Sequence, residues 1–478
     1  MENLRPRREN AGWWILGIIV LLLVGLLLYT FWYYQFREVS PEFNDPAELF
    51  KYGSIGSEEA EGVPLLVWEV LPDICADKLP GDDLASFGFI VEPGQSQAIG
   101  TTNRTIGIPR VGVNCALCHT GSVQESADSE PIIILGMPAQ QLDLQSFTSF
   151  LWECAEDEQF TVDNVMAAIQ ENHELSLIDS LVYRYVAIPR TKEDIIKLQE
   201  YFTWYEHAAE FGPGRVDTFS RHKVQFDLPV DADSDYGIVD FPSIWNQAPR
   251  DGLHLHWDGN NDSLFERNIS AALTAGVTQE SVNIPNLEAV GAWLELLPPP
   301  AYPFPIDAAL VAEGEPLYQA HCASCHTFES GNIGQVIPLA EIGTDPNRVQ
   351  AFTPALVESL HTLGQGQPWQ FSHFRTTDGY ANMPLDGIWA RAPYLHNGSV
   401  PTLRDLLESP ENRPAVFYRG YNVFDSVNVG FISSGPEAEA NGFAFDTTAE
   451  GNDNGGHLYG LDLTPAEKAA LIEYLKSQ

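Results

Sequence analysis

Basic residues are scarce in this sequence. Its 478 residues include 25 Lys and Arg against 66 Asp and Glu, which gives a formal net charge of −41 at pH 7. A surface this negative repels phosphate backbones, so we predict that the protein does not bind nucleic acid. The charge favours a cationic partner such as a basic electron carrier. Adaptation to a salty habitat is the alternative explanation for the excess of carboxylates.

Cysteine and methionine are also rare, with six and four residues. Four of the cysteines lie in two CxxCH motifs, CALCH at 115–119 and CASCH at 322–326. The other two, Cys75 and Cys154, stand on either side of the first motif. In an oxidising compartment they can form a disulfide, and the alternative is two separate buried thiols. The scarcity of methionine leaves few thioether ligands for a metal.

No charged residue occurs in residues 11–34, AGWWILGIIVLLLVGLLLYTFWYY. At about 1.5 Å per residue, a helix of this length spans a hydrocarbon core of roughly 30 Å. Arg5, Arg7 and Arg8 precede it, so the positive-inside rule places the N-terminus in the cytoplasm and the rest of the chain outside. A cleaved signal peptide is the alternative, although no small-residue cleavage site follows the segment.

The two CxxCH motifs carry the chemistry. Two thiols separated by two residues can each form a thioether with a haem vinyl group, and the adjacent His supplies the proximal imidazole to iron. A zinc site shared by the two CxxC pairs is the alternative, but it does not explain why a His follows both pairs. We therefore predict two covalently bound haem c groups, one held by Cys115, Cys118 and His119 and the other by Cys322, Cys325 and His326.

The sixth ligand decides what each haem does. An iron with two strong protein ligands transfers electrons, whereas an open position can bind oxygen or peroxide. For the second haem the candidates are His457, in the Gly-rich loop GNDNGGHLYG, and Met383, in the segment ANMP. For the first haem we can name no sixth ligand.

The chain divides most clearly at 297–305, LPPPAYPFP, because five prolines in nine residues cannot continue a helix. On both sides of this point the order is a haem motif, a long middle section and a closing amphipathic helix. We predict a mainly α fold of two cytochrome-c-like haem domains with long, loop-rich insertions. The expected segments are a cytoplasmic N-terminus at 1–10, a transmembrane helix at 11–34, a tether at 35–62, and haem domains at 63–299 and 300–478.

Apolar residues at helical spacing predict several helices. In the last one, Thr464 is the expected N-cap, with Pro465 at the first helical position and Glu467 closing a capping box. The predicted helices cover residues 143–160, 162–175, 191–211, 285–297, 463–478 and the approach to the second motif from 313.

The motifs and their surroundings resemble the bacterial di-haem cytochrome c peroxidase superfamily, which includes MauG and the di-haem rubber oxygenases. The resemblance covers about residues 63–478. It rests on NCALCHTG, HWDGNNDSLFERN, CASCHTF, RAPYLHNGSVPTL and GGHLYG. Within the superfamily the rubber-oxygenase branch is the most similar, because of PYLHNGSVP and the late histidine.

The resemblance implies different roles for the two haems. The N-terminal haem would be the reactive one, with His119 proximal and an open distal side, and the C-terminal haem would be the electron relay held by His326. Trp257 matches the tryptophan that lies between the haems, and His396 matches the family motif that supports the ligands. His457 matches the distal histidine of the rubber-oxygenase branch, and so the sixth ligand of the second haem.

The sequence also departs from the peroxidase pattern. Peroxidases take a Met after the PYLHNGS-type motif as a haem ligand, and no Met follows Met383 here. They also place a Gln and a Glu after the WDG-type motif as acid–base groups. Here Arg267 stands at the first position, and Glu280 lies only near the second. These departures argue against ordinary hydrogen peroxide reduction, and a membrane anchor argues against cleavage of an extracellular polymer.

We therefore predict a membrane-anchored periplasmic di-haem cytochrome, an oxidoreductase of the peroxidase or oxygenase type. Peroxide or O2 would react at the first haem, and the second would relay electrons from a redox partner protein or a quinone-linked donor. A pure electron-transfer cytochrome is the alternative, but such a function needs far fewer residues. Asp and Asn residues in the loops 258–262 and 452–454 are candidate ligands for a calcium ion between the halves.

Overall fold

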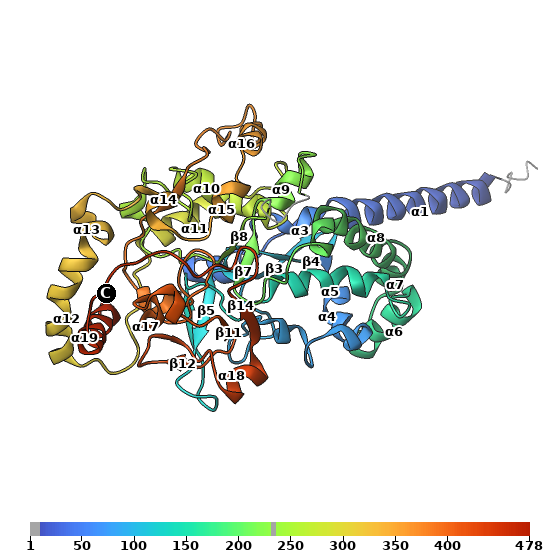
Figure 1. The fold of residues 1–478 in the computed structure, drawn as a ribbon. Helices are drawn as coiled ribbons and strands as arrows, with labels where there is room; N and C mark the ends of the chain where they lie inside the picture. The colour runs from blue at the N-terminus through green and yellow to red at the C-terminus, as the bar shows by residue number, and fades with distance from the viewer. Residues whose placement is uncertain (1–9, 231–235) are drawn as a thin grey trace, which may run out of the picture.

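The computed structural model describes residues 10–230 and 236–478. Helix α1 (Asn10–Phe36) projects from one side of a body that contains the other elements (Figure 1). Its stretch Gly12–Tyr34 has a mean hydropathy of 2.6 and is long and apolar enough to cross a membrane, a test that a signal sequence also passes. Residues 1–9, with the three arginines of the expected cytoplasmic segment, lie outside the described residues.

Residues 35–62 are not a free tether, contrary to the prediction. Strand β1 (Glu38–Val39) pairs antiparallel with β3 (Thr101–Ile106), and α2 (Pro46–Tyr52) buries Phe50 in an apolar core. The acidic and Gly/Ser-rich composition of this stretch hid the few apolar side chains that attach it. The end of α1 is therefore joined to the body without a flexible linker.

A four-stranded sheet adjoins the C-terminal end of α1, which contacts its strand β3. It has the order β1-β3-β4-β2, and its remaining strands are β2 (Val63–Pro64) and β4 (Ile108–Val113). The stretch before the first haem motif forms β3 and β4. The largest apolar core connects this sheet to four helices, α4 (Leu65–Ile74), α5 (Leu144–Glu156), α6 (Val162–Asn172) and α8 (Ile188–Gln199).

Helices form in all the segments where apolar spacing predicted them. The predicted capping box of Thr464 and Glu467 is present at the start of the last helix. The segment 191–211 differs in part, because α8 gives way to a 3-10 stretch, η5 (Glu200–Glu206), in which Phe202 leaves helical geometry at φ −126°. The other predicted helices are α5, α6, α11 (Ile284–Leu296), α12 (Ala308–His321) and α19 (Pro465–Lys476).

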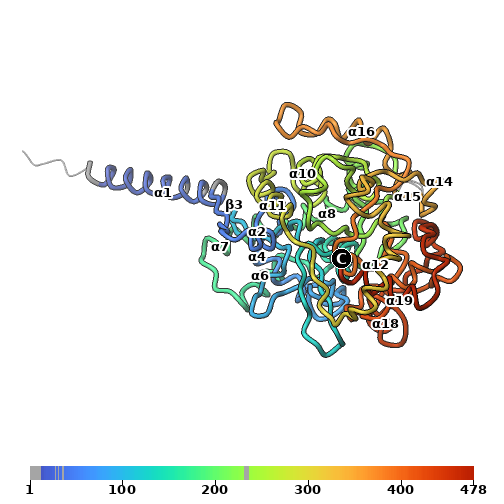
Figure 2. Tube along the Cα trace, turned by 90° about the vertical axis from the view of Figure 1, so that its left-hand side faces the viewer, coloured from blue at the N-terminus to red at the C-terminus, as the bar shows by residue number. Residues whose placement is uncertain are grey.

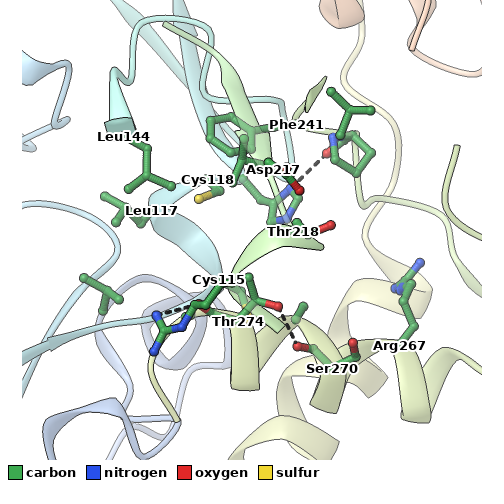
Figure 3. Close-up of a pocket in the computed structure, with 18 of the residues that line it drawn as sticks. Cys115, Leu117, Cys118, Leu144, Asp217, Thr218, Phe241, Arg267, Ser270 and Thr274 are labelled. Atoms are coloured by element: carbon green, nitrogen blue, oxygen red, sulfur yellow. Dashed lines mark hydrogen bonds between the residues drawn. The ribbon is translucent and has the colours of Figure 1, made fainter. Parts of the chain in front are cut away.

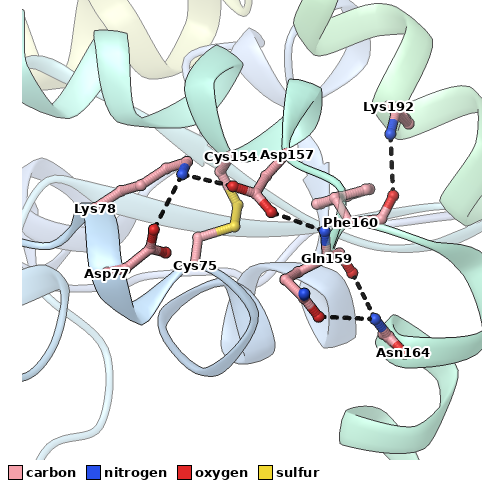
Figure 4. The surroundings of a disulfide bond; sticks show 9 residues. All are labelled: Cys75, Asp77, Lys78, Cys154, Asp157, Gln159, Phe160, Asn164 and Lys192. Atoms are coloured by element: carbon pink, nitrogen blue, oxygen red, sulfur yellow. Dashed lines mark hydrogen bonds and ion pairs between the residues drawn. A yellow bond between two sulfur atoms is a disulfide. The ribbon is translucent and has the colours of Figure 1, made fainter.

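Cys75 and Cys154 form a disulfide (Figure 4). Cys75 follows the last turn of α4 and Cys154 lies in α5, and both side chains are fully buried. Beside them, Lys78 pairs with Asp157 at 2.5 Å. The structure thus decides between the two states that the sequence left open, and the crosslink joins positions 79 residues apart.

The helix that leads into the second haem motif packs on the C-terminal helix. At their crossing, a Cβ on Gly314 of α12 would lie 2.1 Å from the carbonyl oxygen of Ala470 in α19. One turn along α12, the ring of Tyr318 lies 5.1 Å from that of Tyr474. Gly314 therefore allows the two helix backbones to approach closely.

Replacing Gly314 with Val should lower the free energy of unfolding by about 3 kcal/mol, because the added side chain overlaps backbone that cannot move aside. Chemical denaturation of the haem-loaded protein measures this. Glu313→Ala, an exposed substitution on the same helix, should change it by less than about 0.5 kcal/mol. Equal stability of the two variants would show that the helices do not cross at Gly314.

Segments from each half of the chain pack into the apolar core of the other half, across the predicted boundary at residue 300. Side chains between 351 and 374 pack with α10 (Leu264–Thr274) and with Leu287 of α11. Conversely, Val123, Met137 and Trp245 pack into the core of the second half. The halves are not independent packing units, and the division into two haem domains stays a prediction.

Candidate haem sites

Each CxxCH motif closes a short helical turn. The amide of His119 donates to the carbonyl of Cys115 at 3.1 Å, and the amide of His326 donates to the carbonyl of Cys322 at 3.1 Å. Residues four apart in such a turn lie on the same side of the chain. Both motifs therefore have the local geometry in which a cysteine and the histidine can meet one haem.

A backbone carbonyl holds each proximal imidazole. Nδ1 of His119 lies 2.9 Å from the carbonyl oxygen of Pro242, and Nδ1 of His326 lies 2.7 Å from that of Met383. A carbonyl only accepts, so Nδ1 carries the proton and donates, which leaves the lone pair on Nε2. Metal-ligating histidines are oriented in this way. The two sites therefore fit a haem iron at Nε2.

Burial keeps these imidazoles neutral. It lowers the pKa of His119 to about 4 and also lowers that of His326, although the hydrogen bond to the carbonyl raises both. Burial likewise lowers the pKa of His457 to about 3, and the neighbouring His326 adds to this shift. Because a metal binds the neutral imidazole, all three histidines are in the right form for it at neutral pH.

His457 faces His326. Their ring centroids are 6.3 Å apart, with 46° between the ring planes. A metal–imidazole bond is about 2 Å long, so two imidazoles on opposite sides of one metal have centroids about 6 Å apart. His457 comes directly after Gly456 and has a left-handed backbone, with its own φ at 50°. Its amide donates to the carbonyl of Ile342 at 2.9 Å. The separation leaves room for one iron between the two histidines.

Met383 lies elsewhere. Its carbonyl accepts the proton of His326 Nδ1, so it stands on the side of the ring away from Nε2. Its sulfur accepts a hydrogen bond from Arg250 at 3.2 Å, and its side chain lines the cavity of the first motif. Of the two candidate ligands for the second haem, only His457 is opposite His326, and Met383 supports the proximal ring.

The first motif opens on a cavity of about 320 Å³. Cys115 and Cys118 lie on one side of it, and Arg267, Ser270 and Thr274 reach it from α10 (Figure 3). Most of the remaining lining is apolar, and it includes Leu144, Phe147, Phe241, Leu287, Leu294 and Phe352. The cavity is large and apolar enough to receive a flat hydrophobic group attached to the two cysteines.

Arg267 brings a positive charge into this cavity. Its guanidinium donates to Gln247 Oε1 at 2.5 Å and to Asn268 Oδ1 at 3.0 Å. Burial lowers its pKa to about 10, which still leaves it charged at neutral pH. It also contributes to the low pKa of His119, so the two groups are near one another. The cavity thus combines apolar walls with cationic hydrogen-bond donors, since Arg221, Arg250 and Arg348 also line it.

Trp257 connects the supports of the two proximal histidines. Its indole N–H donates to the carbonyl of Asp240, two residues before Pro242, at 2.9 Å. Its own carbonyl accepts from the amide of Ala381, two residues before Met383, at 2.9 Å. Trp257 therefore lies between the segments that hold His119 and His326, and its role in electron transfer stays a prediction.

His396 is buried beside Tyr380. The two rings stack with centroids 4.0 Å apart, and the Tyr380 hydroxyl lies 2.9 Å from His396 Nε2. The carbonyl of His396 accepts from the amide of Asp240 at 2.9 Å. His396 thus supports Asp240, whose own carbonyl accepts the indole N–H of Trp257. His396 is not among the described residues that line the first cavity. The role of His396 in the chemistry stays a prediction.

His256, which no sequence motif singled out, also lines the first cavity. Its backbone is left-handed, with φ at 61°, and its Nε2 is buried without a hydrogen-bond partner among the described residues. Burial holds its pKa well below the usual range. The signal in the sequence is its place directly before Trp257 in HLHWDG.

A metal site outside the haem motifs finds no support in the described part of the chain. No group of three or more His, Cys, Asp or Glu side chains there could hold a metal ion, which leaves the zinc alternative without a site. Asp258 of the first candidate calcium loop pairs with Arg348 at 3.3 Å. In the second loop the Asp453 carbonyl accepts from Asn397 and Ser399. The calcium ion stays a prediction.

Comparisons with known proteins place these sites in a wider class. Residues 379–418 match the family model described as RoxA-like, cytochrome c-like, and residues 309–384 match that of the cbb3-type cytochrome c oxidase subunit III. These matches support a cytochrome c family and indicate a haem redox protein with covalently bound haem c.

Two uncharacterized proteins of Sinorhizobium fredii are similar in sequence. The protein y4iM is 37% identical over 220 residues, which cover 41% of this chain and 50% of that protein. The protein y4iJ is 26% identical over 524 aligned positions, which cover 84% of this chain and 85% of that protein. The chain therefore spans only half the length of y4iM but most of the length of y4iJ.

Proposed function

We propose that this protein is a membrane-anchored di-haem oxidoreductase of the peroxidase or oxygenase type. The observation that carries the proposal is the difference between the two sites. His326 faces His457 across a gap that fits one iron, whereas His119 adjoins a cavity that contains Arg267. The first site is therefore the reaction site, and the second relays electrons.

A haem at the first site supplies one-electron chemistry toward peroxide or O2. The side chains around it set the conditions for that chemistry. The apolar walls exclude water, and Arg267 offers a charged N–H donor that attracts and orients a polar or anionic oxidant. His119 would hold the iron through Nε2, because its Nδ1–H is held by the Pro242 carbonyl.

Trp257 provides a route between the two sites. Its hydrogen bond to the Asp240 carbonyl and the bond from Ala381 to its own carbonyl fix it between the segments that hold His119 and His326. An aromatic ring at this position can pass single electrons from one haem to the other. His396 keeps this arrangement through its carbonyl bond to the Asp240 amide.

Helix α1 is proposed to be the membrane anchor rather than a cleaved signal. The haem sites then face the periplasm, since the positive-inside rule keeps the preceding arginines in the cytoplasm. This location agrees with the disulfide of Cys75 and Cys154, because disulfides persist in oxidising compartments. The electron donor is proposed to be a redox protein or a quinone-linked enzyme at the same membrane.

Electron transfer alone is the second candidate function. The match of residues 309–384 to the cbb3-type oxidase subunit III favours a relay role for the second haem. The two functions differ at the first haem, which has an open position in an oxidoreductase of the proposed type and two protein ligands in a pure carrier.

A cyanide titration of the purified ferric protein tests the proposal. We expect one cyanide to bind per chain, at the first haem, because His457 closes the second. The shift of the Soret band measures the stoichiometry. His119→Gly, which removes the proximal ligand of the first haem, should change the spectrum of the cyanide complex. A protein in which neither haem binds cyanide would be a pure electron carrier.

Arg267 should matter for reactivity with the oxidant. We expect Arg267→Ala to slow the peroxide-dependent spectral change by about 100-fold, since one charged donor aimed at the reacting group is removed. Stopped-flow absorbance measures the rate, and Arg267→Lys should recover part of it. Arg190→Ala, at an exposed position of α8, is the control and should change nothing. An unchanged rate in Arg267→Ala would remove this residue from the reaction site.

A further inference from the structure

One face of the segment 177–186 exposes large apolar side chains. Leu177 is 78% exposed, Leu181 48% and Tyr185 70%, and Ile178 and Val186 extend the same surface. These five residues belong to α7 (Leu177–Val182) and the following π-helical turn η4 (Tyr183–Ala187). We call them the α7 apolar face. In a chain with a net charge of −41, such a surface calls for a partner.

The spacing of the face is that of an amphipathic helix. Leu177, Leu181 and Tyr185 recur every four residues and share one side. The opposite side is already packed, because Tyr183 and Ala187 are buried in the core that contains α4, α5 and α6. The exposed side is therefore a second apolar surface in addition to the one that folding needs.

The face lies beside the end of α1. The hydroxyl of Tyr34, the last residue of the apolar stretch, donates to Asp179 Oδ1 of α7 at 2.5 Å. The carbonyl oxygen of Tyr34 also packs on Gly107, whose φ is 70°. A Cβ on Gly107 would lie 1.8 Å from that oxygen, so only glycine fits at this contact. Both views show α7 on the side of the body from which α1 projects (Figures 1 and 2).

These contacts set the height of the face relative to a membrane. Tyr34 ends a span of 23 apolar residues, so in a bilayer it lies at the boundary between hydrocarbon and headgroups. Its partner Asp179 is at the same level, and Ile178 and Leu181 are within one helical turn of Asp179. Apolar helix faces in such a position enter the bilayer to a depth of about 5–10 Å.

We propose that the α7 apolar face inserts into the lipid–water interface of the membrane that α1 crosses. The partner is the phospholipid bilayer itself. This inference rests on the proposed anchoring by α1 and adds a second attachment, which fixes how the haem sites are oriented above the membrane. Tyr185 is the type of residue found at that interface, and the neighbouring Arg184 is paired with Asp163.

Site-directed spin labelling of the full-length, haem-loaded protein in phospholipid nanodiscs tests the inference. In that protein four cysteines carry haem and two form the disulfide, so an added cysteine is the one free thiol. A nitroxide at Leu181→Cys is compared with one at Val20→Cys in α1 and one at Val427→Cys. Val427 is 75% exposed in the turn between β12 (Phe424–Asp425) and β13 (Gly430–Phe431). Accessibility to oxygen reports lipid, and accessibility to a nickel complex reports water.

We expect the oxygen-to-nickel accessibility ratio at Leu181→Cys to exceed that at Val427→Cys by about tenfold, since oxygen concentrates in hydrocarbon and the complex is excluded from it. A ratio equal to that at Val427→Cys would place the face in water and overturn the inference. Low accessibility to both reagents would show that a protein surface covers it, which overturns it as well. A high ratio at Val20→Cys with a low ratio at Leu181→Cys would leave the membrane anchor intact and overturn only the inference. A low ratio at Val20→Cys would overturn both the anchor and the inference.

Discussion

Replacing His457 with Ala should convert the second haem from low spin to high spin. His457 and His326 face each other with ring centroids 6.3 Å apart, so in the proposed arrangement the substitution removes one of two strong ligands and leaves a vacant position. The electron paramagnetic resonance spectrum of the ferric protein should lose the low-spin signal of this haem. Its optical spectrum should gain a charge-transfer band of high-spin iron, and the second haem should then bind cyanide.

Two variants serve as controls for this result. Met383→Leu should keep the second haem low spin, because the sulfur of Met383 contacts Arg250 and its carbonyl lies behind His326. His207→Ala, at an exposed histidine, should leave both spectra unchanged. A low-spin second haem in His457→Ala, or a high-spin one in Met383→Leu, would assign the sixth ligand to another residue.

Removing the disulfide by Cys75→Ser together with Cys154→Ser should lower the free energy of unfolding by about 4 kcal/mol. The crosslink closes a loop between positions 79 residues apart, and chain entropy in the unfolded state accounts for a loss of this size. Both cysteines are fully buried, so the new hydroxyls also meet an apolar core. Guanidinium unfolding, followed by circular dichroism, measures the change.

A reducing agent provides the matched control for the disulfide. Reductant should destabilise the native protein by a similar amount and leave the double variant unaffected, because thioether bonds to haem are not reduced. If the double variant unfolds within about 0.5 kcal/mol of the native protein, the two cysteines do not constrain the chain.

Local patterns in the sequence predicted the helices well. The capping box at Thr464, the apolar stripe of α11 and the approach helix before the second motif all depend on residues close together in the chain. The same holds for the apolar stretch of α1. Composition misled only in residues 35–62, where Phe50 and its neighbours are few but are buried by a distant part of the chain.

Contacts between distant residues were beyond local patterns. Nothing near His119 in the chain points to the Pro242 carbonyl, and nothing near His326 points to that of Met383. The choice between His457 and Met383 likewise needed the folded loop, since both residues follow the second motif at a distance. The Gly-rich loop made His457 a candidate, and the family resemblance favoured it and supplied the role of Trp257, whereas His256 became visible only as a member of the cavity lining.

The two haem sites are proposed to differ, with an open sixth position at the first iron and a closed one at the second. Low-temperature electron paramagnetic resonance of the resting ferric protein, with both haems quantified against the iron content, tests this difference most directly. We expect one high-spin signal from the site of His119 and one low-spin signal from the site of His326 and His457, in equal amounts. Two low-spin signals that peroxide and cyanide leave unchanged would show that both sites are closed and identify a pure electron-transfer cytochrome.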